Sequence, residues 1–158
     1  MRMKKAAAFL VSAVLCLQML PAVSLAAEST GSSISGNGVR VDYDSGSGAI
    51  TLYRLDGGEA VQASKPSAMG YPIIGGQSVK DFAISDCTVE TGITGTMGAG
   101  ERMTITSSSP STGLTRTYIL ETSDAVEGGL YTTTTYQAGD TAVIADWFVD
   151  NEFELYGA

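Results

Sequence analysis

The sequence contains no histidine, and this absence removes most of the common catalytic arrangements. Ser-His-Asp and Cys-His sites need an imidazole to take up a proton, so neither can form here. Zinc sites of the usual nitrogen and sulfur kinds are excluded as well. The glycines stand at turns, and none forms a phosphate loop between a strand and a helix. The sequence therefore predicts no catalytic residue, no metal site and no cofactor.

Cysteine is nearly absent too, with two residues in the whole chain. Cys16 lies in the apolar N-terminal run, which leaves Cys87 as the one thiol of the remaining chain. No internal disulfide can then form, and stability must come from packing. Cys87 lies in a strand-like run, and without a histidine to activate it we expect a buried, inert thiol and not a nucleophile.

Basic residues are few, at nine against seventeen acidic ones, and the formal net charge is −8. Arg2, Lys4 and Lys5 lie within the first five positions, so the rest of the chain is more acidic still. Binding to nucleic acid or to anionic lipid needs clustered lysine and arginine. The composition therefore excludes nucleic acid and membrane surfaces as partners.

The N-terminus has the three parts of an export signal. A basic start precedes the apolar run at residues 6–20, and Ser24-Leu25-Ala26 supplies the small residues that a signal peptidase reads. No other segment approaches the roughly 20 apolar residues of a membrane span. We expect a cleavable signal helix at residues 1–26, a flexible lead-in at 27–38, one domain at 39–158, and a secreted product (extracellular or periplasmic) that does not stay in the membrane.

Alternation of apolar and polar residues predicts strands along the domain. Turns recur about every 8–12 residues, and no window shows the 3.6-residue apolar period of a helix. The fold class is therefore all-β, an antiparallel β-sandwich with almost no helix. Strands are expected at residues 39–44, 49–54, 59–63, 79–91, 102–107, 115–122, 130–137 and 141–149.

Two segments and the chain end carry more specific expectations. Residues 65–76 contain two prolines and a Gly-Gly pair, which predict a crossing loop. Residues 141–149 form the most apolar stretch after the signal and are expected to be a central strand. The chain ends with Phe153, Leu155 and Tyr156 close together, which indicates an incomplete sandwich and a truncated product.

Asp42 and Asp44 resemble the opening of a calcium loop, because carboxylates at alternate positions can face one hard cation. The match fails at the sixth position, where Ser47 stands in place of glycine, and at the twelfth, where Tyr53 stands in place of glutamate. A solvated hairpin turn is the favoured interpretation.

Two further sets of residues are candidates for sugar chemistry. Paired carboxylates serve glycosidases as acid and nucleophile, and aromatic faces stack on sugar rings. The spacing selects no pair of carboxylates, so a solvated strand face is favoured for them, and most of the aromatic residues are expected in the core. The carboxylates are Asp140, Asp146, Asp150, Glu152 and Glu154, and the aromatic residues are Tyr53, Tyr71, Tyr131, Tyr136 and Trp147.

Several segments together resemble a known family. The hairpin pattern of residues 39–54, the apolar-Gly-Gly turn in 72–81, the strands in 98–106 and 113–121 and the extended runs of 131–149 are similar to the N-terminal β-sandwich of α-galactosidase-type glycoside hydrolases. The resemblance implies a supersandwich-like domain that precedes a catalytic barrel. The family's catalytic aspartates lie on that barrel, which would begin beyond Ala158, so no residue of this chain inherits their role.

The sequence leaves three functions open. The first is a non-catalytic β-sandwich module, or fragment, of a secreted glycoside hydrolase-like enzyme, which is inactive alone, packs against a downstream catalytic domain and helps to wall a carbohydrate site. The second is a freestanding extracellular module that binds a glycan or a protein through exposed aromatic residues. The third is a surface-structural domain without a ligand. The sequence does not identify the ligand-binding residues.

Overall fold

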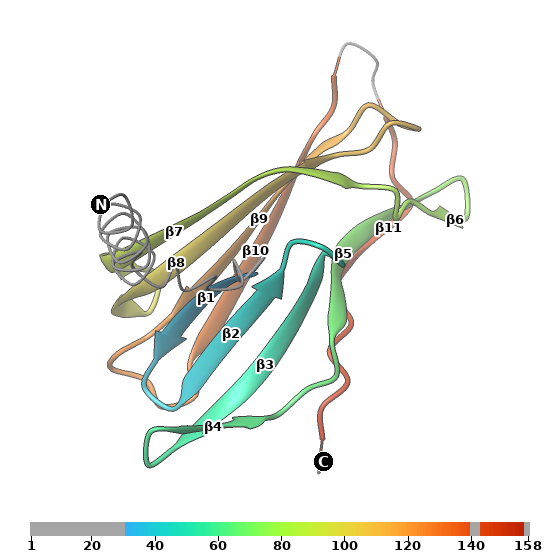
Figure 1. Ribbon diagram of the computed structural model, residues 1–158. Helices are drawn as coiled ribbons and strands as arrows, with labels where there is room; N and C mark the ends of the chain where they lie inside the picture. Colours follow the sequence, from blue (N-terminus) through green and yellow to red (C-terminus); the bar gives the residue numbers. More distant parts are fainter. Residues whose placement is uncertain (1–30, 140–142, 157–158) are drawn as a thin grey trace, which may run out of the picture.

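The computed structural model describes residues 31–139 and 143–156, and every regular element among them is a β-strand (Figure 1). None of the described residues belongs to a helix of the length and apolarity needed to cross a membrane. The strands are β1 (Gly31–Gly36), β2 (Val39–Asp44), β3 (Ala49–Asp56), β4 (Glu59–Gln62), β5 (Ser67–Ile74), β6 (Gln77–Ser78), β7 (Ala83–Gly95), β8 (Gly98–Ser108), β9 (Thr115–Thr122), β10 (Leu130–Gln137) and β11 (Trp147–Asn151).

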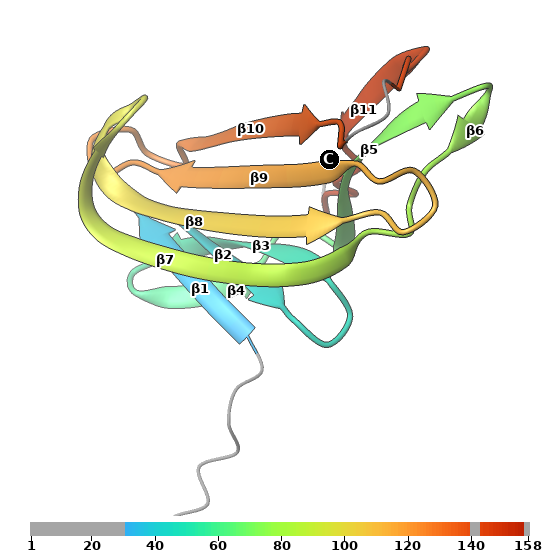
Figure 2. The same ribbon diagram turned by 90° about the horizontal axis from the view of Figure 1, so that it is seen from above.

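These strands form two sheets in which neighbouring strands run antiparallel. The larger sheet has the order β1-β2-β3-β5-β11, with β4 beside β3 and β6 beside β5, and the smaller has the order β10-β9-β8-β7. Figure 2 shows the smaller sheet lying as a layer over β1 to β4, while β5, β6 and β11 extend to one side. The predicted all-β class with two packed antiparallel sheets is confirmed.

The core lies between the sheets and is built by alternate residues of their strands. In β2, Val39, Val41 and Tyr43 are buried, whereas Arg40 and Asp42 between them are partly exposed. This period of two places one face of the strand on the core. The central buried cluster draws on both sheets and consists of Ile34, Val41, Tyr43, Ile50, Met69, Met103, Ile105, Tyr118 and Leu120.

The first strand lies earlier in the chain than expected. Order was expected from Val39, but β1 spans Gly31–Gly36 within the segment predicted to be a flexible lead-in. Its one large apolar residue, Ile34, is completely buried and pairs with Val41 of β2. A single well-placed side chain and a neighbouring strand are enough to order this polar segment. The predicted signal at residues 1–26 lies outside the described residues.

Residues 65–76 are not the crossing loop that their prolines and glycines predicted. Most of the segment is strand β5, in which Pro72 is fully buried. β3 pairs only with the start of β5, and β6 pairs only with its last two residues. Pro72 lies opposite Phe148 of β11, and on its other side its carbonyl oxygen accepts a hydrogen bond from the Val79 N–H at the end of the short β5–β6 ladder, where a missing N–H breaks few ladder bonds.

The apolar segment near the C-terminus is also placed differently from expectation. The strand there is β11, and it lies at the end of its sheet, beside β5, instead of in the centre. Trp147 and Phe148 are 58% and 52% exposed. The apolar run predicted a strand with a hydrogen-bonded neighbour on each side. A strand at the end of a sheet has such a neighbour on one side only, which leaves its side chains more exposed. Residues 141 and 142 of the expected strand lie outside the described residues.

Candidate functional site

The most unusual polar side chain of the fold is that of Arg116, which points into the sandwich. In β9, Arg116, Tyr118 and Leu120 are buried and alternate with the half-buried residues between them. Arg116 is only 4% exposed, and the two residues that follow it on this face belong to the central cluster. The fold therefore places a guanidinium at a position that the strand period reserves for the core.

The contacts of Arg116 are with neutral groups. Its Nε donates a hydrogen bond to Ser107 Oγ at 3.1 Å, and its Nη1 donates to the carbonyl oxygen of Gly70 at 2.7 Å. The guanidinium carbon lies 4.3 Å from the centre of the Phe82 ring, a cation–π contact. Among the described residues, no carboxylate oxygen forms an ion pair with this arginine.

Three phenols surround the guanidinium and remain neutral. Burial raises the pKa of Tyr136 to about 12, and burial likewise raises the pKa values of Tyr43 and Tyr118. Burial also lowers the pKa of Arg116, because removal from water disfavours its charged form. The Oη atoms of Tyr43 and Tyr136 are buried without a hydrogen-bond partner in the described part of the chain. The phenols therefore supply no counter-charge to the arginine.

Arg116 lines a pocket of about 390 Å³. We call it the Arg116 pocket, and its wall is formed by Ser45, Gly46, Ser47, Gly48, Ala68, Met69, Tyr71, Lys80, Phe82, Ile84 and Arg116. The turn between β2 and β3, the strand β5 and the segment that leads into β7 each contribute to it. The pocket thus lies where the two sheets meet.

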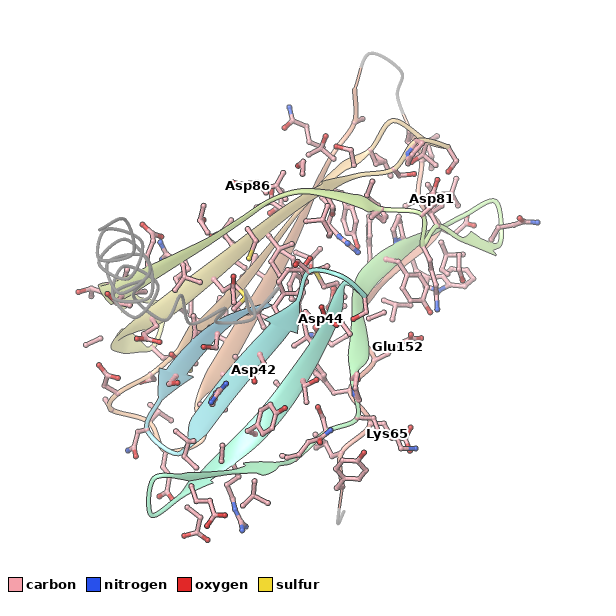
Figure 3. All side chains as sticks on the ribbon, viewed as in Figure 1. Asp42, Asp44, Lys65, Asp81, Asp86 and Glu152 are labelled. Carbon is pink, nitrogen blue, oxygen red and sulfur yellow. The ribbon has the colours of Figure 1, made fainter. Side chains whose placement is uncertain are left out.

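A second cation, Lys80, stands in the wall of this pocket. Its Nζ lies 4.0 Å from the centre of the Tyr71 ring and 3.5 Å from Glu152 Oε2. Tyr71 Oη donates to Glu152 Oε1 at 2.6 Å, and Figure 3 shows Glu152 beside β5. The hydrogen bond from Tyr71, aided by the charge of Lys80, lowers the pKa of Glu152. Glu152 therefore stays ionised and balances Lys80, while Arg116 remains unbalanced.

The residues considered for calcium have other partners. Asp42 accepts two hydrogen bonds from Arg40, at 2.6 and 2.9 Å. Asp44 accepts from the Gly46 N–H at 2.8 Å and from Ser47 Oγ at 2.7 Å, which closes the β2–β3 turn. Both aspartates lie on β2 (Figure 3). The described residues contain no cluster of three or more histidine, cysteine, aspartate or glutamate side chains that could hold a metal ion.

The carboxylates near the C-terminus are used to attach the last strand. Asp146 accepts from the Gly76 N–H at 2.8 Å, and Glu154 pairs with Lys65 at 2.5 Å. Glu152 binds Tyr71 and Lys80 as described. Asp140 lies outside the described residues. These contacts are structural, but of the described members only Asp150 lies on a strand, β11, so the set does not form the solvated strand face that was predicted.

The aromatic residues considered for sugar stacking are less buried than expected. Of the five, only Tyr71 is buried, whereas Tyr131 and Trp147 are exposed. Tyr53 and Tyr136 are intermediate. The prediction that most of them belong to the core is wrong, because two of the strands that carry them, β10 and β11, lie at the ends of their sheets.

Cys87 is a free thiol of intermediate exposure, less buried than predicted. Its Sγ lies 3.6 Å from Ser32 Oγ, and its side chain packs against the central cluster. The spacing of the sequence did not single out Arg116, Lys80 or the pocket that they line. One local signal was available, since Arg116 lies two residues before Tyr118 on the alternating face of β9.

The C-terminal segment exposes several large apolar side chains. Trp147 and Phe148 are more than half exposed, and Tyr136 stacks on Phe148 with a ring-centre distance of 5.1 Å. We call the exposed set the C-terminal apolar residues: Ile144, Trp147, Phe148, Leu155 and Tyr156. Isolated exposed apolar residues are common, but five within thirteen positions are a feature of contact sites.

Comparison with known proteins gives one informative relationship. No family model matches the chain. The chain is similar to an A type blood alpha-D-galactosamine galactosaminidase of Flavonifractor plautii, with 51% identity over 170 aligned positions. The alignment takes in the whole of this chain but only 16% of that protein. The chain thus spans about one sixth of the length of a glycosidase to which it is closely similar.

Proposed function

We propose that this chain is a non-catalytic β-sandwich module of a larger, secreted, carbohydrate-active protein of the glycoside hydrolase kind. The observation that carries the proposal is the 51% identity with a galactosaminidase across the entire chain. Identity at that level over the whole of this chain supports a shared structural role. The proposed role is to pack against a catalytic part of the polypeptide that breaks the glycosidic bond.

The C-terminal apolar residues support this packing role. Ile144 is 85% exposed and Leu155 is 55% exposed, on the last described stretch of the chain. Burying such side chains against another domain contributes about 25 cal/mol per Å² of apolar area. The basic, apolar and small-residue pattern of residues 1–26 supports export of the product.

Two measurements test the proposal. Reading the DNA beyond codon 158 should reveal a reading frame, direct or after a frameshift, that continues into alternating strands and helices. The purified chain should release no measurable product from aryl α-galactosaminides or aryl α-galactosides. Robust hydrolysis by the chain alone would refute a non-catalytic role. N-terminal sequencing of the exported product should find a start directly after Ala26.

A freestanding glycan-binding module is the second candidate, and the exposure of Trp147 favours it, because an open indole face can stack on a sugar ring. Glycan-array binding by the isolated chain that disappears in Trp147→Ala would support this candidate. Binding that is absent in the isolated chain, together with a continuing reading frame, would favour the packing role.

A further inference from the structure

We propose that the Arg116 pocket binds a sugar residue that carries a carboxylate group, such as a uronic acid. The carboxylate assignment rests on the geometry around Arg116, and the sugar assignment rests in addition on the proposed carbohydrate role. The pocket is separate from Trp147, the exposed aromatic residue considered above, which does not line it.

The charge of Arg116 is not balanced by any carboxylate of the described residues. The arginine is 4% exposed, and its described hydrogen bonds go to the neutral acceptors Ser107 Oγ and Gly70 O. A buried charge is costly unless an opposite charge compensates it. Asp150 influences the neighbouring phenols of Tyr118 and Tyr136 but makes no ion pair with the guanidinium. An anion in the pocket would supply the missing compensation.

Arg116 has more hydrogen-bond donors than its described partners use. A guanidinium has five N–H groups in a planar fork that suits a carboxylate. Nε and Nη1 of Arg116 each donate one bond, and although the Tyr136 phenol lies near enough to stabilise the charged guanidinium, at least two of the five N–H groups are left without an acceptor among the described residues. The pocket lined by this side chain is therefore open to an acceptor with two oxygens.

The size and lining of the Arg116 pocket suit a single sugar residue. Its volume of about 390 Å³ lies within the range typical of small-molecule sites, about 300–1,000 Å³. Phe82 and Tyr71 supply aromatic walls, and Lys80 adds a second cation. Because Glu152 balances Lys80, the uncompensated positive charge of the pocket is that of Arg116. Aromatic walls with a cationic end suit a sugar ring with one carboxylate.

The test is an NMR titration of the ¹⁵N-labelled chain with three probes. Galacturonate is the acidic sugar, galactose is its neutral counterpart, and N-acetylaspartate amide carries a carboxylate without a sugar. We expect galacturonate to shift the Arg116 Nε–H signal and the amides of residues 46–48 with a Kd of about 1–10 mM. Galactose should produce no such shift, and the blocked aspartate should bind more weakly than galacturonate.

Two lysines of similar environment give the matched variants. The side chains of Lys80 and Lys65 are 52% and 50% exposed, and each pairs with one glutamate. Only Lys80 lines the pocket. Lys80→Gln should raise the Kd for galacturonate about three- to tenfold, and Lys65→Gln should leave it unchanged. Arg116→Gln should abolish the binding, and Lys80→Gln carries the test if that variant does not fold.

Three outcomes would overturn the proposal. The first is the absence of shifts at the pocket with any probe. The second is equal binding of galactose and galacturonate, because charge would then play no part. The third is tighter binding of the blocked aspartate, which would assign the pocket to a polypeptide carboxylate. None of these outcomes depends on whether a catalytic domain follows the chain, which the reading frame decides separately.

Discussion

Arg116 of β9 and Gly70 of β5 are joined by a hydrogen bond of 2.7 Å from the guanidinium Nη1 to the carbonyl oxygen, and this contact connects the two sheets. Gly70 also faces β11, where a Cβ atom would overlap the carbonyl oxygens of Val149 and Asp150. Because Gly70 has no side chain, β5 can lie against β11, and the carbonyl oxygen of Gly70 can accept the hydrogen bond from Arg116. The pocket and the last strand depend on the same close approach.

Gly70→Ala should destabilise the fold by about 1–3 kcal/mol, because the added methyl group forces β5 and β11 apart. Urea unfolding followed by tryptophan fluorescence of Trp147 measures this change. Gly46→Ala is the control, since the nearest atom to its Cβ position is Asp44 Oδ1 at 3.3 Å and its backbone is not left-handed. Equal losses in the two variants would contradict the close approach at Gly70.

Tyr118 and Tyr43 form a matched pair of buried phenols with opposite expectations. Tyr118 Oη donates to Asn151 Oδ1 on β11, whereas Tyr43 Oη has no partner among the described residues. Tyr118→Phe should cost about 1–2 kcal/mol, because it leaves the amide oxygen of Asn151 without its donor.

Tyr43→Phe should leave the unfolding free energy within about 0.5 kcal/mol of the parent value or raise it, since it removes an unsatisfied buried hydroxyl. Hydrogen exchange of the β11 amides should increase in Tyr118→Phe and stay unchanged in Tyr43→Phe. A greater loss of stability in Tyr43→Phe would show that its hydroxyl has a partner in solution.

Strands with a regular period were predictable from the sequence. The expected strands at 115–122 and 130–137 coincide with β9 and β10, because alternation and β-branched threonines specify a half-buried strand locally. β1 and β5 were missed for the opposite reason. β1 has only Ile34 to bury, and β5 contains Pro72, so both strands depend on distant neighbours that a local window does not contain.

The spacing of residues along the sequence could not predict the Arg116 pocket. Tyr71, Lys80 and Arg116 come from three different parts of the chain and meet only where β5 passes from its pairing with β3 to its pairing with β11. The alternation of β9 did place Arg116 on the core face, and an arginine at such a position marks a candidate site. The exposure of Trp147 depended on the strand order, which its apolar surroundings do not reveal.

The stability of the fold should decrease as the pH decreases, because the ion pair of Glu121 is lost when its carboxylate is protonated. This side chain is 6% exposed, and it accepts bonds from Arg102 Nη2 at 2.6 Å and from the Thr96 N–H at 2.7 Å. Burial alone would raise the pKa of Glu121, but the hydrogen bonds from Thr96 and Arg102 outweigh it, so the pKa is lowered. The resulting stabilisation is complete above the unfolded-state pKa of about 4.3 and is lost as the pH falls through the lower folded-state pKa.

Glu121→Gln should therefore reduce the unfolding free energy by about 2 kcal/mol at neutral pH, and this reduction should shrink below about pH 4. Urea unfolding at a series of pH values measures the difference. Glu59→Gln, at an exposed position of β4, should have little effect at any pH. A Glu121→Gln difference that stays constant with pH would rule out the ionised pair as its cause.

Trp147 and Phe148 test whether β11 presents a free aromatic face. The two side chains are exposed to a similar extent and point to opposite sides of the strand, but only Phe148 has a described aromatic partner, Tyr136. Phe148→Ser should cost about 1 kcal/mol through the lost stacking, and Trp147→Ser should change stability by less than about 0.5 kcal/mol. Trp147→Ser should also reduce self-association in sedimentation velocity runs, because it removes an exposed apolar contact. A stability loss in Trp147→Ser as large as that in Phe148→Ser would mean that the indole is covered within the chain and is not available to a second domain or a glycan.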